Sequence, residues 1–463
     1  MAVAPDARIT VSGTGRVFWR GDESYESARG SAVWNALKPD RYPDVIVVVS
    51  SREDVVAAVK FAREHDMKVA VRSGGHNMSG APVRDGGMLI DLSHLRKCIV
   101  DPAGSAAIVQ PSVTAAQLAG QLGGHRLAFP VGHASSVALG GYLLAGGFGW
   151  NMGAWGPACF SVTAIEVVTA DGNVVKADAD HNEELFWAAR GSGSGFFGVA
   201  TRFWLNVYPL PASIRESTYV CALAEVEEIS QWSTDVSVDL PRKLDLLVAI
   251  VSAPPGLPAG PAGKAVVISA SAFGDSDEEA EQLLEIASSC PSIERALVRL
   301  DNQPSSFEAL HRQIDGLLPA GSRYAEDSLW SNRSQAELLP RLAEQLVGAP
   351  SPGSKVMSPV FSAARRGTLP DAAFSLADRT FALCYAIWEE EADDESNIDW
   401  LRRSVRSVEP LTVGRYIAEN DLRADGVRAQ SSFMPTNWDR LKALKAKYDP
   451  HDLFHGYLGP QSA

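Results

Sequence analysis

Apolar and polar positions near the start of the chain follow alternating patterns. Residues 43–49 form a run rich in valine and isoleucine, typical of a strand that is buried on both faces. Ser51 and Asp54 then form a capping-box pattern, and an amphipathic stretch continues to about His65. Residues 68–71 resemble a second strand, so the pattern predicts a strand–helix–strand unit. Further helices are predicted over 22–37 and 113–122, and further strands over 87–92 and 106–109.

From about residue 210 to 405, the pattern changes to longer strands separated by prolines and polar helices. Two strands are predicted over 243–252 and 264–273, joined by a Pro/Gly-rich loop, with a polar helix over 277–287 after them. Another strand is predicted over 379–388. Long strands interspersed with helices indicate an α+β arrangement on an antiparallel sheet.

An acidic run covers residues 389–395. A metal site is one interpretation, but the run offers no ligand geometry, and a solvated connection between a strand and a helix is the simpler one. A last helix is predicted over 437–447, and the Asp449–Pro450 step ends it.

The segment 71–80 concentrates small and flexible residues around one histidine, His76. Gly74 and Gly75 can adopt positive φ and expose backbone N–H groups, which is the concave arrangement that holds a phosphate. Arg72 adds a positive charge. A glycine turn with an incidental histidine is the alternative, and the segment by itself leaves both open.

Five glycines lie between 140 and 149, interleaved with large apolar residues. Each glycine inside a helix costs about 1 kcal/mol, so this density favours backbone pressed against a flat ligand. A flexible linker is the alternative, but linkers are rich in serine rather than in Leu, Phe and Trp.

The glycine cluster 191–198 superficially matches a dinucleotide fingerprint. That fingerprint requires a strand before it and a helix after it. Here a helix is predicted over 184–189 and a strand over 199–208, so the order is reversed. A turn beside a different cofactor fits better.

Composition narrows the class of protein. The 463 residues suggest two or three domains, and 46% hydrophobic with 21% charged residues fits a globular enzyme. The net charge of −14 argues against a nucleic-acid partner. The five cysteines are scattered and form no zinc-type cluster, so we expect no metal site. No signal peptide and no apolar run long enough for a membrane span are apparent, so we expect a cytoplasmic protein.

Taken together, these segments resemble the flavin-linked oxidases of the vanillyl-alcohol-oxidase superfamily, in particular its berberine-bridge-enzyme-like group. The resemblance covers nearly the whole chain. It rests on Trp34-Asn35, Pro43, 71–80, Gly140-Gly141 through Gly149-Trp150, 191–198, Trp400, Tyr416-Ile417 and Lys447 to Pro450. It implies an FAD-binding domain over 1–208, an inserted α+β substrate domain over 209–405 and a C-terminal segment, 406–463, that returns to the FAD domain.

The resemblance also implies the site. In this family, the histidine at the position of His76 is commonly bonded to the flavin ring (an 8α-histidyl bond). Many members form a second bond through a cysteine, but Ala134 occupies that position here. A small residue or valine at the position of Val137 is associated in the family with access of oxygen to the flavin. Tyr416 is the candidate proton-handling residue, and a nearby cation could lower its pKa from about 10. The FAD-binding candidates are Arg72, Ser73, Gly74, Gly75, His76, Asn77, Ser79, Val137, Gly140, Gly141, Gly146, Gly147, Gly149, Trp150, Gly195, Val199 and Tyr457.

Two departures from the family pattern limit what can be transferred. A Phe-x-His-Arg element is replaced by residues 374–377, and an Asn-Gln pair after the terminal phenylalanine is replaced by 455–457. Substrates of relatives are therefore not carried over.

The resemblance implies an FAD-dependent oxidase. It takes a hydride from a small hydrophobic or aromatic alcohol or amine, and O2 reoxidises the flavin to give H2O2. Alternatives are an oxidative cyclase for a natural product, a flavin dehydrogenase with another acceptor, a non-catalytic flavin-binding protein and a nicotinamide-dependent reductase. The expected assembly is a monomer or a homodimer.

Overall fold

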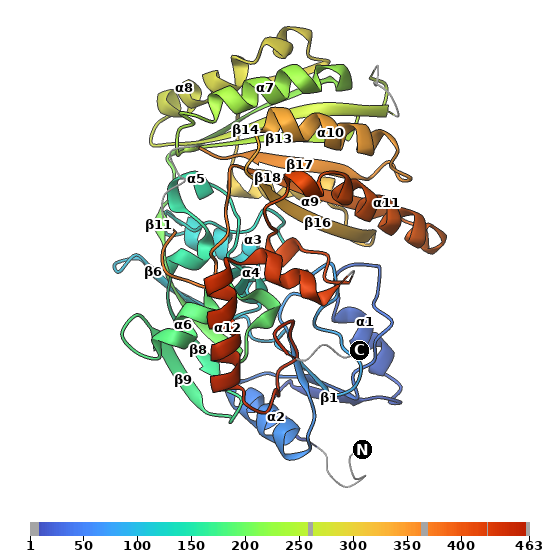
Figure 1. Ribbon diagram of the computed structural model, residues 1–463. Helices are drawn as coiled ribbons and strands as arrows, with labels where there is room; N and C mark the ends of the chain where they lie inside the picture. Colours follow the sequence, from blue (N-terminus) through green and yellow to red (C-terminus); the bar gives the residue numbers. More distant parts are fainter. Residues whose placement is uncertain (1–8, 258–262, 363–368, 424, 460–463) are drawn as a thin grey trace.

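The fold has two stacked parts (Figure 1). The computed structural model describes residues 9–257, 263–362, 369–423 and 425–459. The lower part combines N-terminal segments with the C-terminal helix, and the upper part is a broad sheet covered by helices. The predicted α+β class is confirmed.

The first sheet of the lower part contains the predicted strand–helix–strand unit. Its order is β1 (Arg16–Trp19), β2 (Val45–Val48), β4 (Met88–Asp91) and β3 (Val69–Arg72). Strands β2 and β3 run parallel to β4, which lies between them. Helix α2 (Arg52–Glu64) begins with the predicted capping box of Ser51 and Asp54.

Helix α1 (Tyr25–Ser31) is shorter than the predicted 22–37. The chain leaves the helix because the backbone N–H of Trp34 donates to the carbonyl of Gly75 instead of to its own helix. The residues after α1 therefore belong to the loop around His76.

The second sheet of the lower part is antiparallel. Its order is β5 (Cys98–Asp101), β6 (Ala106–Val109), β10 (Val199–Asn206), β8 (Val162–Val168) and β9 (Val174–Asp178), with a small pair β7 (Leu127–Ala128) and β11 (Tyr208–Pro209) beside it. The helices here are α3 (Ala115–Gly123), α4 (Leu139–Ala145), α5 (Met152–Trp155) and α6 (Glu183–Ala189). Helix α6 precedes and β10 follows the 191–198 turn, so the reversed order is confirmed.

The upper part is a seven-stranded antiparallel sheet. Its order is β15 (Val298–Pro304), β12 (Ser213–Ala222), β14 (Lys264–Gly274), β13 (Leu244–Ser252), β17 (Lys355–Val360), β18 (Thr380–Trp388) and β16 (Arg323–Ser331). The outer face is covered by α7 (Val226–Val236), α8 (Asp277–Ser288), α10 (Gln335–Val347) and α11 (Asp394–Ser407) (Figure 1). Helix α9 (Phe307–Leu317) contacts α3 of the lower part.

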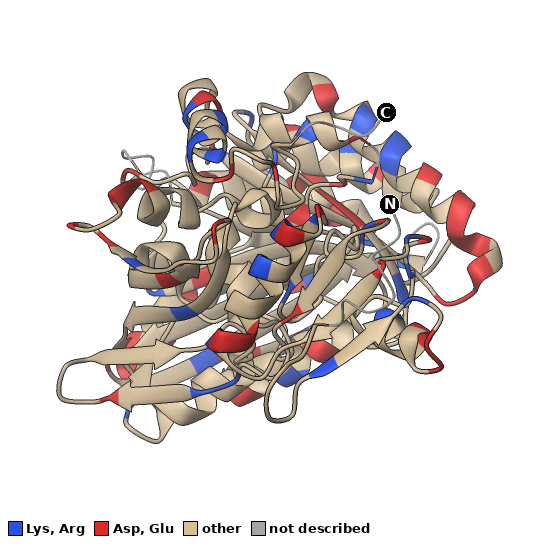
Figure 2. Cartoon of the chain, turned by 90° about the horizontal axis from the view of Figure 1, so that it is seen from below, with Lys and Arg blue, Asp and Glu red and all other residues tan. Residues whose placement is uncertain are grey.

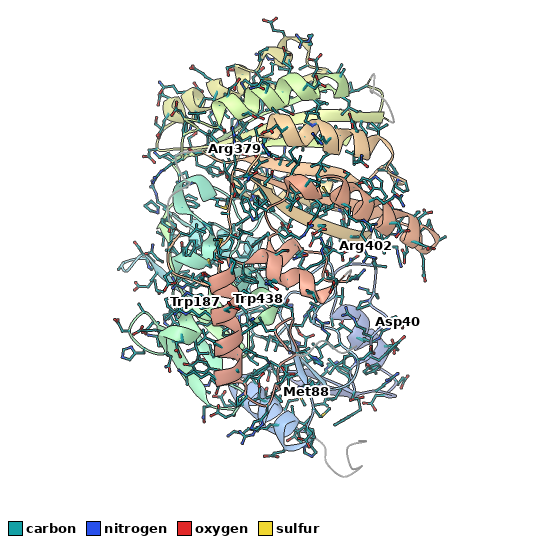
Figure 3. The ribbon with its side chains drawn as sticks, in the orientation of Figure 1. Asp40, Met88, Trp187, Arg379, Arg402 and Trp438 are labelled. Carbon is teal, nitrogen blue, oxygen red and sulfur yellow. The ribbon has the colours of Figure 1, made fainter. Side chains whose placement is uncertain are left out.

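The C-terminal segment closes the lower part. Helix α12 (Pro435–Tyr448) packs on α6, and Trp187 and Trp438 lie at the same level where these helices meet (Figure 3). Phe454 then pairs with Val69 of β3, and Val69 exchanges backbone hydrogen bonds of 2.8 and 2.7 Å with Leu453 and His455. The predicted boundaries at 208 and 405 remain a proposal, which fits the strands of the upper sheet lying between them.

Basic and acidic residues are intermingled along the ribbon (Figure 2). Among the residues that the structure describes, no helix combines the length and the apolar character needed to cross a bilayer.

Asn35 joins the two parts of the fold through a fully buried side-chain amide. Its Nδ2 donates to the carbonyl of Tyr324 on β16 at 2.8 Å and to the carbonyl of Met78 at 3.3 Å. Its Oδ1 accepts from the backbone N–H groups of Tyr324 at 2.9 Å and Leu37 at 3.0 Å. One side chain thus fixes the His76 loop against the upper sheet.

Replacement of this amide should weaken the whole protein. We expect Asn35→Ala to lower the free energy of unfolding by about 3 kcal/mol, because several buried backbone groups lose their partner. Urea denaturation followed by circular dichroism measures the change. The exposed Asn332 supplies the control, since Asn332→Ala should stay within about 0.5 kcal/mol of the wild type. Equal stabilities of the two variants would contradict this role.

Candidate functional site

A cavity of about 520 Å³ lies between the lower part and the inner face of the upper sheet. It brings together the glycine loops of the lower part and strands β13, β14, β17 and β18 of the sheet. The predicted residues that line it are Arg72, Ser73, Gly74, Gly75, His76, Asn77, Val137, Gly140, Gly141, Gly149, Trp150 and Tyr416.

The remaining predicted residues lie behind this lining. They are Ser79, Gly146, Gly147, Gly195, Val199 and Tyr457. Tyr457 packs on Gly195, where an added Cβ would stand 2.3 Å from the tyrosine ring, and its hydroxyl donates to the carbonyl of Ser192. Their geometry therefore supports the cavity wall, and any influence on a ligand passes through their neighbours.

The His76 loop is held by close backbone contacts that only glycine permits. Gly75 has φ +74°, and a Cβ there would lie 2.4 Å from the carbonyl oxygen of Ala32. A Cβ on Gly74 would lie 2.6 Å from that of Ala138, which precedes α4. The two glycines thus let the loop pass between the α1 region and the α4 region.

His76 itself is fixed from two sides. Its ring stacks on Trp34 with centroids 4.7 Å apart, and its Nε2 lies 3.0 Å from the hydroxyl of Ser136. Burial, followed by the charge of Arg72, lowers the pKa of His76 to about 4. The imidazole is therefore neutral near pH 7 and keeps a nitrogen lone pair.

Arg72 lines the cavity, but its charge has a partner in the protein. Its guanidinium forms an ion pair with Asp91 at 2.9 Å and donates to the carbonyls of Ala32 and Ser31 at 3.2 Å. The positive charge predicted for an anion thus mainly holds the loop in place.

Two residues outside the predicted site offer nitrogen atoms instead: Arg84, which the sequence did not single out, and His455, which it marked only as a departure from the family pattern. Arg84 and His455 both line the cavity, and Nε of Arg84 and Nε2 of His455 are buried without a hydrogen-bond partner among the described residues. Burial, with the charges of Arg84 and Lys68, lowers the pKa of His455 to about 4. No local sequence motif marks Arg84, since it follows the glycine loop in an irregular segment.

The glycine-rich stretch after residue 138 forms a helix, α4, despite its glycines. Gly140 is tolerated because a Cβ there would lie 2.8 Å from Oγ of Ser73 and 2.9 Å from Cβ of Pro111. Gly141 has no protein atom within 4 Å of such a Cβ and lines the cavity. Gly141 therefore has the open space that the predicted backbone contact with a flat ligand requires, whereas Gly140 packs against protein.

Tyr416 lies between the two parts, and its ring stacks on Phe148 with centroids 4.3 Å apart. Its hydroxyl oxygen accepts the backbone N–H of Gly147 at 2.9 Å. Burial, and then the charge of Glu419, raises the pKa of Tyr416 well above its ordinary value. The causes of this shift include no cation that lowers the pKa of Tyr416, so this geometry favours a role in orienting a substrate over a role as a base near pH 7.

The sheet side of the cavity adds titratable residues that sequence reasoning missed. Glu326 on β16, Lys355 on β17 and Tyr385 on β18 line it, and Glu419 approaches from the short helix Ile417–Glu419. No sequence signal marks Glu326, because a carboxylate inside a strand is usually expected to be exposed to solvent.

Comparison with known proteins identifies a family to which the chain is similar. The FAD binding domain family matches residues 43–178. The chain is 30% identical to the FAD-linked oxidoreductase nodO of Hypoxylon pulicicidum, over 97% of this chain and 99% of that protein.

The fold is also that of solved flavoenzymes. 6-Hydroxy-D-nicotine oxidase from Arthrobacter nicotinovorans superposes with a TM-score of 0.84 at 22% identity, covering 98% of this chain and 100% of that one. Berberine bridge enzyme from Eschscholzia californica gives 0.83 at 19% identity, covering 97% of each chain. The chain belongs to the FAD-linked oxidoreductases, and its fold is that of berberine bridge enzyme. The family predicted from the sequence is confirmed.

The cavity of this oxidoreductase fits FAD. Nε of Arg84 and Nε1 of Trp150 are buried N–H donors without a partner among the described residues, as an oxygen-rich ligand requires. Gly141 leaves one wall open to a planar ring. Residues of the His76 loop and of α4 are the ones that would hold the cofactor, beside the aromatic face of the upper sheet.

A side chain at Gly141 tests this placement. We expect Gly141→Leu to keep the stability of the fold. The variant should lower the affinity for flavin by about tenfold or more, because the leucine side chain enters the space proposed for the ligand. A tenfold change corresponds to about 1.4 kcal/mol of binding free energy. The ratio of flavin absorbance to protein absorbance measures the loading.

The control is Gly30→Ala in α1, whose added Cβ also meets no protein atom within 4 Å but which lies outside the cavity. This variant should keep full flavin loading. Normal loading of Gly141→Leu would place the cofactor elsewhere.

Proposed function

We propose that the protein is an FAD-dependent oxidase for a small hydrophobic or aromatic alcohol or amine, with O2 as the final acceptor and H2O2 as the product. The observation that carries the proposal is that a single cavity joins the His76 loop to the aromatic inner face of the upper sheet. Bound FAD supplies the two-electron acceptor. The chain's own residues position the substrate and handle its proton.

The substrate side of the cavity is largely apolar. Phe148, Phe381 and Leu383 line it beside Tyr416. These belong to a cluster between the two parts of the fold, whose buried members are Met78, Cys159, Tyr324, Trp330, Phe374, Phe381, Leu383, Tyr385, Ile387 and Tyr416. Such a wall excludes water and binds an apolar substrate through burial of its surface.

The proposal is tested by anaerobic mixing of the oxidised protein with amines, aromatic alcohols and sugars. A substrate bleaches the flavin absorbance, and readmission of air restores it with one H2O2 for each substrate oxidised. Bleaching by NADH or NADPH alone would favour a reductase, and absence of bleaching by every compound would favour a non-catalytic flavoprotein.

We further propose that FAD is bonded covalently to His76 and to no second residue. The neutral imidazole of His76, fixed by Trp34 and Ser136, would bond the flavin at its methyl position. The new C–N bond would replace a methyl C–H bond, whose proton is released and whose electron pair passes to the flavin ring and then to O2. Ala134 lines the cavity without a thiol. The cytoplasmic location and the monomeric or dimeric state predicted from the sequence remain proposals as well.

The covalent bond predicts a clear result on acid precipitation. Wild-type protein should retain its yellow flavin in the pellet, whereas His76→Ala should release it to the supernatant because the bond can no longer form. His133→Ala is the matched control, since His133 also lines the cavity, and it should keep flavin in the pellet. Flavin in the wild-type supernatant would contradict the bond at His76.

Val137 should control access of oxygen, because it lines the cavity and follows Ser136, whose hydroxyl lies 3.0 Å from Nε2 of His76. We expect Val137→Leu to slow reoxidation of the reduced flavin by about tenfold, equal to about 1.4 kcal/mol in activation free energy. Stopped-flow mixing of the reduced protein with O2 measures this rate, and Val137→Ala should retain it. An unchanged rate in Val137→Leu would show that oxygen arrives by another route.

A further inference from the structure

Three side chains form a row across adjacent strands of the upper sheet. Glu326 on β16 lies directly opposite Tyr385 on β18, and Tyr385 lies directly opposite Lys355 on β17. Directly opposed residues point to the same face of a sheet, and all three line the cavity. The inner face thus carries one polar row within an apolar wall.

Two carboxyl groups line the same cavity as this row. Glu326 is only 8% exposed and lies opposite Tyr385 in the strand register. Glu419 lines the cavity from the lower part, in the short helix Ile417–Glu419. Oε2 of Glu419 is buried and has no hydrogen-bond partner among the described residues.

The protein supplies no cation to this pair. Within the described part of the chain, neither Glu326 nor Glu419 forms an ion pair with a lysine or an arginine. The neighbouring Asp327 takes the two nearby arginines, Arg415 at 3.4 Å and Arg428 at 2.5 Å. Nζ of Lys355, the third member of the row, donates to the carbonyl of Leu317.

The surroundings suit a positive charge brought by a ligand. Tyr416 and Phe148 are stacked, and Phe381 meets Tyr416 edge-on at 6.3 Å. Aromatic faces attract cations, and a cation bound beside the two buried carboxyl groups would favour their ionised forms. A neutral ligand would not favour those ionised forms.

We propose that Glu326 and Glu419 receive the protonated amino group of the substrate, so that the cavity selects apolar or aromatic amines over alcohols of the same shape. The proposal deepens the oxidase function above, on which it rests for the placement of substrate in this cavity. It assigns the pair to substrate binding, with Tyr385 as the residue that orients Glu326.

The electrostatics agree with this role. Burial raises the pKa of both carboxyl groups, and the charges of Glu419, Asp327 and Asp421 raise the pKa of Glu326 further. An ammonium group between the two carboxyl groups would stabilise their ionised forms and offset part of the free-energy cost of burying those charges. The ligand thus provides the positive charge that the pair lacks.

Binding under anaerobic conditions tests the proposal without turnover in air. The probes are phenethylamine and tryptamine, each compared with the alcohol of the same carbon skeleton, titrated into the flavin-loaded protein by calorimetry. We expect at least one amine to bind about tenfold or more tightly than its alcohol. If no amine binds more tightly than its alcohol, the proposal is overturned.

Substitutions of single residues show which side chains cause the preference for amines. Glu419→Gln and Glu326→Gln should each reduce the amine preference to near unity, whereas Glu395→Gln, at an exposed position of α11, should keep it. A preference that survives in both cavity variants overturns the assignment of the pair. Flavin content and circular dichroism confirm that each variant is folded.

The outcome is separable from that of the oxidase proposal. Amines that bind through the pair but never bleach the flavin would leave the binding site in place and refute the oxidase. Alcohols that bleach the flavin, together with amines that bind no better than these alcohols, would leave the oxidase in place and refute the amine site.

Discussion

The geometry of the site depends on the buried amide of Asn35. It satisfies backbone groups of the His76 loop and of β16 at once, although these belong to different parts of the fold. A buried amide fixes both distance and direction, because its donor and acceptor must each find a partner. Apolar contacts between the parts could slide, but this contact cannot. The distance across the cavity is therefore set by hydrogen bonds at its edge.

The same loop shows how charge is kept out of the cavity wall. Arg72 is neutralised by Asp91, and Asp327 is neutralised by Arg415 and Arg428. The Arg72–Asp91 pair removes a charge that would otherwise face the ligand. The remaining lining is apolar and has few unpartnered polar groups. In such low-dielectric surroundings, each of those groups interacts more strongly with a ligand than it would in water.

Local signals allowed much of the lower part to be predicted. The capping box at Ser51, the apolar run before it and the glycines around His76 each depend on near neighbours in sequence, and all occur as expected. The roles of Arg72 and Gly140 differ because their partners, Asp91 and Pro111, come from elsewhere in the chain.

The sheet side of the site was not predictable for a related reason. Strand β16 carries Glu326 and Asp327 within its buried length, which breaks the expected apolar alternation. Only tertiary surroundings make such carboxyl groups tolerable: Glu326 lies opposite Tyr385 on β18, and Asp327 forms ion pairs with two arginines. Neither partner is visible from the local pattern, and the same holds for the burial that raises the pKa of Tyr416.

The pairing of β3 with Phe454 has a consequence for biosynthesis. Lys68 and Asp452, which flank this pairing and are hydrogen-bonded at 2.7 Å, are 384 positions apart. At typical elongation rates of about 5 to 20 residues per second, the strand that leads into the His76 loop waits about 20 to 80 s on the ribosome for its neighbour. Stable flavin capture is thus expected only after residues 452–455 have been synthesised, so cofactor loading is a late step relative to the synthesis of β3.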